Sequence, residues 1–327
     1  MLRPPRFWSS GSTVLPTLLC PLAALSARLT AARIARPGFA VPVPVICCGN
    51  ATLGGAGKTT LALDLAHRLR AAGIAVHILA RGYGGRARGP LLVRPEHDAA
   101  LIGDEALLLA QVAPTWIGAD RAATARSAFA AGATALVMDD GLQNPTLKKT
   151  LSFIVIDGGG GFGNGRVFPA GPLREPIAAA AARAAAAILI GPDHHGTRAL
   201  LPSALPVLAA RLVPGLEAAA LAGRRVLAFA GIGRPEKFFA TLEEAGAVLV
   251  ARHAFPDHHS YREAELSRLL VGAARLNAMP VTTAKDHVRL PLPLRGRIAL
   301  LTVTLAWDDP TALNALLSPL FPGVALP

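Results

Sequence analysis

Two short segments of this chain carry the residue types that phosphate chemistry requires. The first, Gly-Gly-Ala-Gly-Lys-Thr at 54–59, lies between an apolar run at 43–48 and a periodic stripe of leucines. A glycine-rich loop that joins a strand to a helix presents backbone N–H groups and the positive end of the helix dipole to a phosphate. The second, Asp-Asp-Gly-Leu-Gln at 139–143, ends another apolar run in two carboxylates, which are ligands that a nucleotide-bound Mg²⁺ prefers. Together they predict a magnesium-nucleotide site.

The side chains of these segments have distinct expected roles. Lys58 would contact the β- and γ-phosphates of the nucleotide, and Thr59 would ligate the metal together with Asp139 and Asp140. The carboxylates follow a predicted strand, and open α/β folds bind ligands at the carboxyl ends of their strands. The alternatives are a chance glycine turn for the first segment and a solvated turn for the second.

The loop departs from the strict phosphate-loop pattern at one position. That pattern has a glycine five residues before Gly57, where this chain has Thr52, and the pair at 54–55 could supply the backbone freedom instead. We expect the following residues to bind the nucleotide: Thr52, Leu53, Gly54, Gly55, Ala56, Gly57, Lys58, Thr59, Thr60, Asp140 and Gln143. Arg121 and Arg174 are further candidate phosphate contacts, although each is by default a solvent-facing arginine.

Two other positions could supply a catalytic base. Asp104 opens a predicted helix, where aspartate is a favoured N-cap and needs no catalytic role. A kinase acting on an alcohol does, however, need a carboxylate or imidazole to accept or orient the hydroxyl proton. His258, in Asp-His-His at 257–259, could be an oriented base, a metal ligand or part of a capped turn. No other metal-spaced cluster accompanies it, which disfavours the metal.

These residues need a scaffold, and the chain predicts a parallel sheet covered by helices, because apolar runs alternate with helical stripes. The first half predicts strands near 43–48, 74–80, 134–138, 152–156 and 186–190, with helices near 59–72, 104–112, 121–131 and 177–186. A glycine-rich stretch at 158–163 formally contains G-x-G-x-x-G, but no helix follows, so a Rossmann site is rejected. The expected fold is α/β, a P-loop NTPase-type parallel sheet flanked by helices.

A proline-rich stretch at 202–214 interrupts this alternation, which then restarts. Strands are expected near 226–230, 247–250, 280–283 and 298–304, with helices near 235–245 and 262–276. We interpret this second run as a smaller C-terminal α/β lobe. The expected units are an N-terminal membrane-associated helix at 1–34, a kinase domain at 35–215 and the smaller lobe at 216–327.

The N-terminal segment differs in composition from the rest. The chain has 327 residues and a net charge of +12, and its first 40 residues contain five arginines (3, 6, 28, 33 and 36) and no acid. Such an end favours an anionic surface, either lipid or nucleic acid. The apolar stretch at 14–25 is shorter than the ~20 residues of a spanning helix. We favour a membrane-surface anchor over a signal peptide or an ordinary buried helix, and Cys20, Cys47 and Cys48 fit a reducing compartment.

Taken together, the motifs resemble those of the tetraacyldisaccharide 4'-kinases of lipid A synthesis. The family shows Gly-Asn-x-Thr-x-Gly-Gly-x-Gly-Lys-Thr, found here at 49–59 with Thr52 included. It also shows Arg-Gly-Tyr-Gly (81–84), Gly-Asp-Glu (103–105), Asp-Asp-Gly-x-Gln (139–143), Gly-Asn-Gly-Arg with Pro-Ala-Gly-Pro-Leu-Arg-Glu (163–175) and Asp-His-His (257–259). The chain departs from the usual residue at four positions: Thr60, Ala106, Asn144 and Ala284. None of these removes a proposed phosphate or magnesium contact.

The resemblance implies an ATP- and Mg²⁺-dependent kinase that phosphorylates the 4'-hydroxyl of a tetraacyldisaccharide 1-phosphate to give lipid IVA. It implies a catalytic pair of Asp104 and His258, an anionic acylated disaccharide lipid as partner rather than nucleic acid, and a place at the cytoplasmic face of the bacterial inner membrane. The alternatives are a P-loop nucleotide switch or metallochaperone NTPase, and a membrane-docked protein that merely retains the fold. A switch should hydrolyse nucleotide without lipid.

Overall fold

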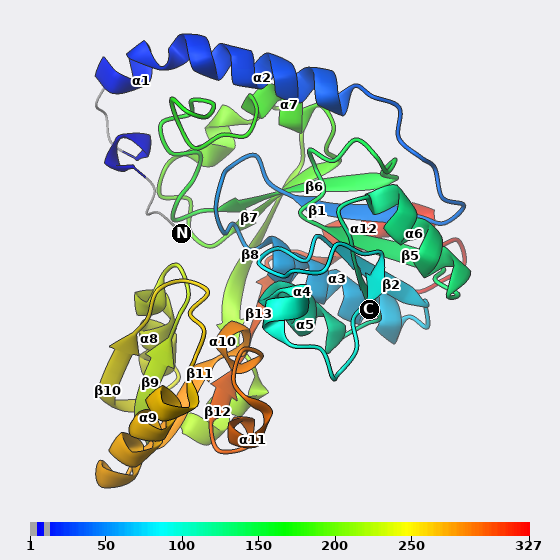
Figure 1. The fold of residues 1–327 in the computed structure, drawn as a ribbon. Helices are drawn as coiled ribbons and strands as arrows, with labels where there is room; N and C mark the ends of the chain where they lie inside the picture. Colours follow the sequence, from blue (N-terminus) through cyan, green and yellow to red (C-terminus); the bar gives the residue numbers. More distant parts are fainter. Residues whose placement is uncertain (1–4, 10–13) are drawn as a thin grey trace.

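The computed structural model describes residues 5–9 and 14–327. Its larger part is a nine-stranded sheet with strand order β13-β8-β7-β6-β1-β5-β2-β4-β3, within which the pairs β13–β8 and β3–β4 are antiparallel and the others parallel (Figure 1). The strands span Val45–Gly49 (β1), Val76–Ala80 (β2), Leu91–Leu92 (β3), Thr115–Ile117 (β4), Ala135–Asp139 (β5), Leu151–Asp157 (β6), Ala186–Ile190 (β7), Val207–Pro214 (β8) and Val303–Trp307 (β13). The expected parallel α/β sheet is confirmed.

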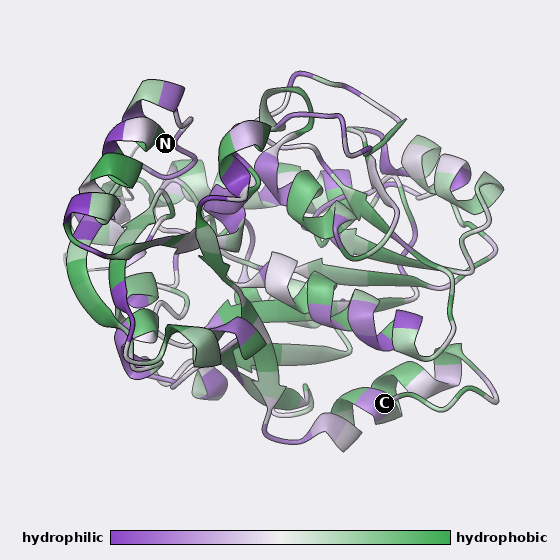
Figure 2. Ribbon diagram, turned by 90° about the horizontal axis from the view of Figure 1, so that it is seen from below, coloured by the Kyte–Doolittle hydropathy of each residue, from purple (hydrophilic) through white to green (hydrophobic). Residues whose placement is uncertain are grey.

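Helices cover both faces of this sheet because each presents one apolar stripe to it. On one face, α3 (Lys58–Ala71), α5 (Asp104–Ala110) and α12 (Pro310–Leu317) pack on the strands. On the other face lie α6 (Arg121–Ala130) and α7 (Ile177–Ala181). The strands between them consist mainly of hydrophobic residues, whereas the helices contain both hydrophobic and hydrophilic residues (Figure 2). This is the burial pattern that gives near-continuous apolar strands.

The order of the central strands places the two phosphate-chemistry segments side by side. Strand β1 lies between β5 and β6, and Cys48 of β1 is the register partner of Asp139 of β5. The loop that follows β1 and the carboxylates that end β5 therefore meet at the carboxyl edge of the sheet. This edge is where open α/β folds bind their ligands.

The second lobe is a four-stranded parallel sheet of order β10-β9-β11-β12. Its strands span Arg225–Ala230 (β9), Val248–Ala254 (β10), Met279–Thr283 (β11) and Ala299–Leu301 (β12). Helix α8 (Pro235–Glu244) packs on one face through paired phenylalanines, and α9 (Glu263–Arg275) packs on the other through leucines. The short helices α10 (Ala284–His287) and α11 (Leu292–Arg295) follow β11. The smaller C-terminal α/β lobe is thus confirmed as part of the fold class.

The end of the chain requires a correction. We expected a strand at 298–304 and a lobe that runs from 216 to 327, but β12 and β13 belong to different sheets. Strand β13 pairs antiparallel with β8, and α12 buries Leu313 and Leu317 in the core of the large sheet. Residues 303–327 therefore return to the larger domain. The proline-rich stretch at 202–214, which interrupted the expected alternation, contains the strand β8 that receives them.

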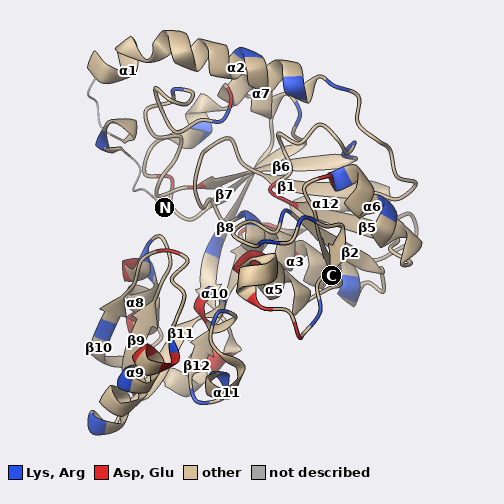
Figure 3. Ribbon diagram, in the orientation of Figure 1, with Lys and Arg blue, Asp and Glu red and all other residues tan. Residues whose placement is uncertain are grey.

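The N-terminal segment lies across the large domain as η1 (Arg6–Trp8), α1 (Val14–Leu18) and α2 (Cys20–Ile34) (Figure 1); Arg3 lies outside the described residues. Helix α2 buries only Ala23, and its Leu22, Leu25 and Leu29 are at least half exposed, as is Leu18 at the end of α1. Basic residues and no acidic ones lie along α2, whereas α1 has no charged residue (Figure 3). Among the described residues, no helix combines the length and the hydrophobicity that crossing a bilayer requires. Because Ala23 is the only buried residue of α2, this helix is not the ordinary buried helix that was the alternative for the segment.

Candidate active site at the lobe interface

The glycine-rich loop links β1 to α3, and its backbone conformation requires glycine at two positions. Gly54 and Gly57 have φ values of 114° and 89°, which residues other than glycine rarely adopt. A Cβ on Gly57 would also lie 2.7 Å from Cδ1 of Ile190 on strand β7. Helix α3 begins at Lys58, so the loop places the free N–H groups of its first turn toward the edge of the sheet.

Asn50, which the sequence prediction did not single out, organises this loop. Its Nδ2 donates to Thr52 Oγ1 at 3.2 Å and to the carbonyl of Gly54 at 3.3 Å. Its Oδ1 accepts a hydrogen bond of 3.2 Å from Nζ of Lys58. Thr52, which stands where the strict phosphate-loop pattern has glycine, thus accepts a hydrogen bond inside the loop. Its place in the Gly-Asn-x-Thr pattern was the available signal for Asn50.

A second segment supports the loop from outside. The Leu53 N–H donates to the carbonyl of Pro172 at 2.7 Å, and the Arg174 N–H donates to the carbonyl of Ala51 at 2.6 Å. Thr52 also forms an isolated bridge with Leu173. The segment at 171–175, far away in the sequence, therefore fixes the shape of the nucleotide loop, and Arg174 belongs to this site.

Asp139 is the strongest candidate for a metal ligand. Its Oδ2 accepts a hydrogen bond of 3.1 Å from Oγ1 of Thr59, the side chain is 4% exposed, and Oδ1 has no hydrogen-bond partner among the described residues. Burial raises its pKa to about 7, and the charges of Glu105 and Asp140 add to the rise. A buried carboxylate oxygen without a partner next to a threonine hydroxyl is a donor set that suits Mg²⁺. Asp139 and Thr59 therefore fit the metal that a nucleotide would carry.

The neighbouring aspartate has the opposite electrostatic environment. Asp140 has a φ of 51°, and its carboxylate accepts two hydrogen bonds from Arg174, at 2.8 and 3.1 Å. Lys58 Nζ lies 3.6 Å from the same carboxylate. Burial raises the pKa of Asp140, but the charges of Lys58 and Arg174 outweigh it and hold the pKa below its ordinary value. The ionised form of Asp140 is thus favoured, and it positions two cations beside the nucleotide loop.

Gln143 connects these residues to a buried acid that we did not predict. Its Nε2 donates to the carbonyl of Asn50 at 2.9 Å and to Oε1 of Glu175 at 2.8 Å, and its Oε1 accepts from Arg174 at 3.3 Å. Glu175 is 2% exposed, and both of its carboxylate oxygens accept hydrogen bonds from Nη2 of Arg183. Gln143 therefore orients the loop and Arg174 from the interior of the protein.

Arg121 has a different environment from the one expected of a phosphate contact. The side chain is 2% exposed, and its guanidinium donates to the carbonyls of Ala80, Gly118 and Asp139. Burial lowers its pKa to about 10. Arg121 therefore donates to backbone carbonyls at the carboxyl ends of β2, β4 and β5, and its donors point to these carbonyls from inside the protein.

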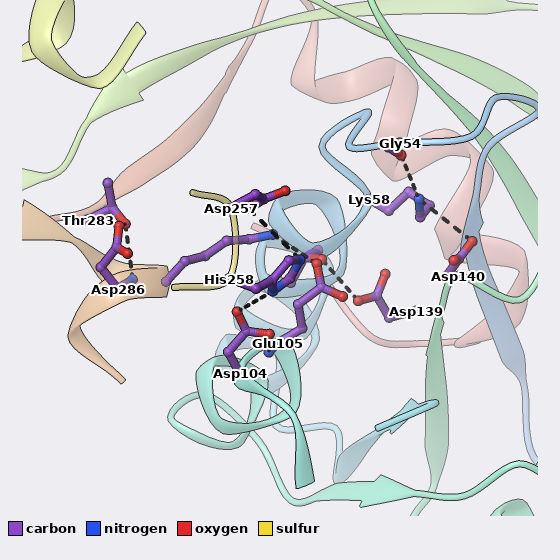
Figure 4. A network of polar contacts seen from close by, with 12 residues as sticks. Gly54, Lys58, Asp104, Glu105, Asp139, Asp140, Asp257, His258, Thr283 and Asp286 are labelled. Carbon is purple, nitrogen blue, oxygen red and sulfur yellow. Dashed lines mark hydrogen bonds and ion pairs between the residues drawn. The ribbon is translucent and has the colours of Figure 1, made fainter. Parts of the chain in front are cut away.

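The two candidate catalytic residues meet across the lobe interface, as Figure 4 shows. Nδ1 of His258, from the second lobe, lies 2.8 Å from Oδ2 of Asp104, from the first residue of α5. Asp104 is 5% exposed, and its Oδ1 accepts a hydrogen bond of 2.9 Å from the Glu105 N–H. The N-cap of α5 is Gly103, so Asp104 does not occupy the capping position.

Each member of this pair shifts the pKa of the other. Burial raises the pKa of Asp104, but the hydrogen bond and charge of His258, with the charges of Arg289 and Lys285, outweigh burial and lower it. The hydrogen bond to Asp104 raises the pKa of His258. A carboxylate held ionised beside an imidazole is the arrangement that a general base requires.

The two histidines of the Asp-His-His segment contact different partners. His258 has a φ of 59° and points to Asp104, whereas His259 Nε2 lies 2.8 Å from Oε2 of Glu265 and its ring stacks on Phe255 at 4.7 Å. Only His258 can assist the base. A second contact between the lobes joins Lys285 Nζ to Oε1 of Glu105 at 2.8 Å.

Comparisons with known proteins identify the family and the fold. The family model described as tetraacyldisaccharide-1-P 4'-kinase matches residues 15–321. The tetraacyldisaccharide 4'-kinase of Gluconacetobacter diazotrophicus is 59% identical over 96% of each chain, and that of Rhodospirillum centenum is 56% identical over 98% of each chain. A crystal structure of LpxK from Aquifex aeolicus in complex with ATP has the same fold, with a TM-score of 0.76, 24% identity, and coverage of 94% of this chain and 100% of that one. This chain therefore belongs to the tetraacyldisaccharide-1-P 4'-kinase family.

Proposed function

We propose that this protein transfers the γ-phosphoryl group of ATP to the 4'-hydroxyl of a tetraacyldisaccharide 1-phosphate, giving lipid IVA in lipid A biosynthesis. The observation that carries the proposal is the placement of an ionised base, Asp104, and a nucleotide loop at one lobe interface. The full-length similarity to tetraacyldisaccharide 4'-kinases supports this choice of substrate.

In this proposal the larger domain holds the nucleotide. Lys58 and Arg174 contact phosphate oxygens, and backbone N–H groups of the loop and of the first turn of α3 supply further donors. Thr59 and Asp139 would ligate Mg²⁺, and Asp140 would contribute its charge to the same site. The metal would supply positive charge beside the phosphate oxygens.

Asp104 accepts the proton of the sugar hydroxyl, and His258 holds and tunes the carboxylate. The hydrogen bond at 2.8 Å fixes the orientation of Asp104 Oδ2. Among the described residues, Oδ1 accepts only the backbone N–H of the adjacent Glu105, so it keeps a lone pair for the substrate. Because His258 comes from the second lobe, the base is complete only when the two lobes are in contact.

We further propose that residues 1–34 form a membrane-surface anchor at the cytoplasmic face of the inner membrane. Helix α2 exposes Leu22, Leu25 and Leu29 beside basic residues, as an interfacial helix does. The kinase domain then comprises 35–215 together with 303–327, and the second lobe comprises 216–302. The partner would be the anionic acylated disaccharide lipid at that surface.

The direct test is to incubate the purified protein with ATP radiolabelled in the γ-phosphate, Mg²⁺ and the tetraacyldisaccharide 1-phosphate, and then to follow the label. The proposal predicts label on the lipid and little release of inorganic phosphate when lipid is absent. Lipid-independent hydrolysis without labelled lipid would instead support a nucleotide switch. Lys58→Ala should abolish labelling, and Arg297→Gln, on the exposed surface of the second lobe, should not.

A further inference from the structure

We propose that Arg289 is a positioning residue that keeps Asp104 ionised and aligned once the two lobes meet. The proposal rests on the proposed function, in which Asp104 is the base. Arg289 follows α10 in the second lobe, and its Nε lies 3.2 Å from Oδ2 of Asp104 in the first lobe. The same oxygen contacts His258, so two groups of the second lobe act on one atom of the base.

The guanidinium is rigidly held. Its Nη1 donates to the carbonyls of Gly231 at 3.1 Å and His259 at 3.2 Å, and the Arg289 side chain is 5% exposed. The carbonyl of His259 belongs to the residue next to His258, so Arg289 ties the histidine loop and the base into one unit. Planar geometry with several donors is what distinguishes arginine from lysine at such a site.

Asp286 keeps this buried cation in place. Its carboxylate is fully buried and accepts hydrogen bonds from the Gly231 N–H at 2.9 Å, Tyr261 Oη at 2.7 Å and Thr283 Oγ1 at 2.6 Å. Arg289 Nη1 lies 3.4 Å from Oδ1 of Asp286. Because Asp286 already has three donors, Arg289 is shared between two acids rather than neutralised by one. Its Nε donates to the carbonyl of Lys285 at 3.0 Å and lies within ion-pair distance of Asp104.

Arg289 differs from His258 in one chemical respect that decides its role. Arginine stays protonated at every pH that a protein tolerates, whereas histidine gains and loses its charge near neutrality. Arg289 therefore supplies a constant positive charge that offsets the burial of Asp104 even when His258 is neutral. The charge of Arg289 also opposes protonation of His258. Both effects favour an ionised Asp104 beside a neutral imidazole, the state able to accept a proton.

The other charged groups around Asp104 and His258 come from both lobes and comprise two acidic residues and one lysine. They are Glu105 on α5, Asp257 at 3.9 Å from Nε2 of His258, and Lys285 on α10. Lys285 is bound to Glu105, which limits its effect on Asp104. Arg289 is the buried cation in direct contact with the base among the described residues.

The test compares Arg289→Gln, which removes the charge, with Arg289→Lys, which keeps it but loses the planar donor set. An opposite charge within ~4–6 Å lowers a carboxyl pKa by about one to three. With His258 still present, we expect the acidic limb of the kcat profile for Arg289→Gln to move up by about one pH unit. At pH 7, where Asp104 stays ionised in both proteins, kcat should change much less than it does on the acidic limb, and KM for ATP should stay within about twofold.

Arg289→Lys should keep the acidic limb near that of the wild type, and the control Arg297→Gln should match the wild type throughout. An unchanged acidic limb in folded Arg289→Gln, with an active wild type, would overturn the proposal while leaving the proposed function intact. An inactive wild type would instead refute the proposed function.

A second readout does not depend on activity. In the nucleotide-free protein, NMR titration should show a higher pKa for His258 in Arg289→Gln than in the wild type, with His258→Ala identifying the signal. Should the single variant fail to fold, the double variant Asp286→Asn, Arg289→Gln removes both buried charges together and should show the same rise. A pKa of His258 that does not change in the folded variant would contradict the proposal.

Discussion

Replacing Asp139 by asparagine should stabilise the nucleotide-free protein although it removes a proposed magnesium ligand. Burial raises the pKa of this carboxyl from 3.8 to about 7, with Glu105 and Asp140 adding to the rise. A difference of one in pKa corresponds to about 1.4 kcal/mol, so ionising Asp139 in the folded state costs at most about 4 kcal/mol. Asparagine has nearly the same shape, can still accept from Thr59, and carries no charge.

The sign of the pH dependence follows from the raised pKa. Below pH 3.8 both the folded and the unfolded protein hold the proton, and the wild type incurs no cost. Between that pH and about 7 only the unfolded state has lost it, so the wild type loses stability as the pH rises. The advantage of Asp139→Asn should therefore be larger at pH 8 than at pH 5, by up to about 3 kcal/mol.

Urea unfolding of both proteins at pH 5 and pH 8, without nucleotide and with a chelator, measures this difference. Addition of Mg²⁺ and ATP should then stabilise the wild type and have much less effect on the variant, because a ligand stabilises only in proportion to its affinity. The reasoning would be refuted if the variant were less stable than the wild type at pH 8, since that result would mean that the Asp139 charge is already compensated by the protein.

Three further predictions address other parts of the structure. Arg174→Ala should raise KM for ATP by more than it lowers kcat, because it leaves the base untouched; steady-state kinetics in which kcat alone fell would contradict this. Leu22→Asp with Leu25→Asp should weaken sedimentation with anionic vesicles without changing the circular dichroism, since both side chains are more than half exposed; unchanged sedimentation would count against the anchor. Lys285→Ala should cost at most about 1 kcal/mol in urea unfolding, because the ion pair is partly exposed; a much larger loss would show that it is a main support of the interface.

The elements around the nucleotide loop were predictable because their signals are local. Leu61, Leu65 and Leu69 recur at helical spacing and are all fully buried in α3. The run before them forms β1, whose five residues are all buried. Two aspartates directly after an apolar run needed only the rule that parallel strands end at one edge. Local pattern thus placed the loop and Asp139 correctly.

The return of the chain to the large sheet was not predictable in this way. Strands β12 and β13 are separated by Thr302 alone, and the apolar run at 298–304 reads as one strand. Which sheet a strand joins depends on partners far away, here β8 for β13 and β11 for β12. Periodicity carries no information about those partners, so the boundary at the end of the chain was wrong.

The contacts that complete the site were not predictable from local pattern for a similar reason. Asp104 and His258 are 154 residues apart, and spacing alone favoured a capping role for the aspartate. Arg289 gave no motif signal, since one arginine near a short helix is usually solvent-exposed. The burial of Arg121 beneath two strand ends also depends on tertiary packing. Residues whose role is to position another group are therefore the part of a site that sequence patterns reveal least.

The central claim is that nucleotide binding belongs to the loop and Asp139, whereas proton removal belongs to Asp104. Single-turnover phosphoryl transfer from radiolabelled ATP to saturating lipid, measured together with ATP affinity for the wild type and Asp104→Ala, tests it directly. The account predicts transfer slowed by about a hundredfold or more, with the Kd for ATP unchanged within about twofold. Normal transfer by the variant would contradict the assignment of the base.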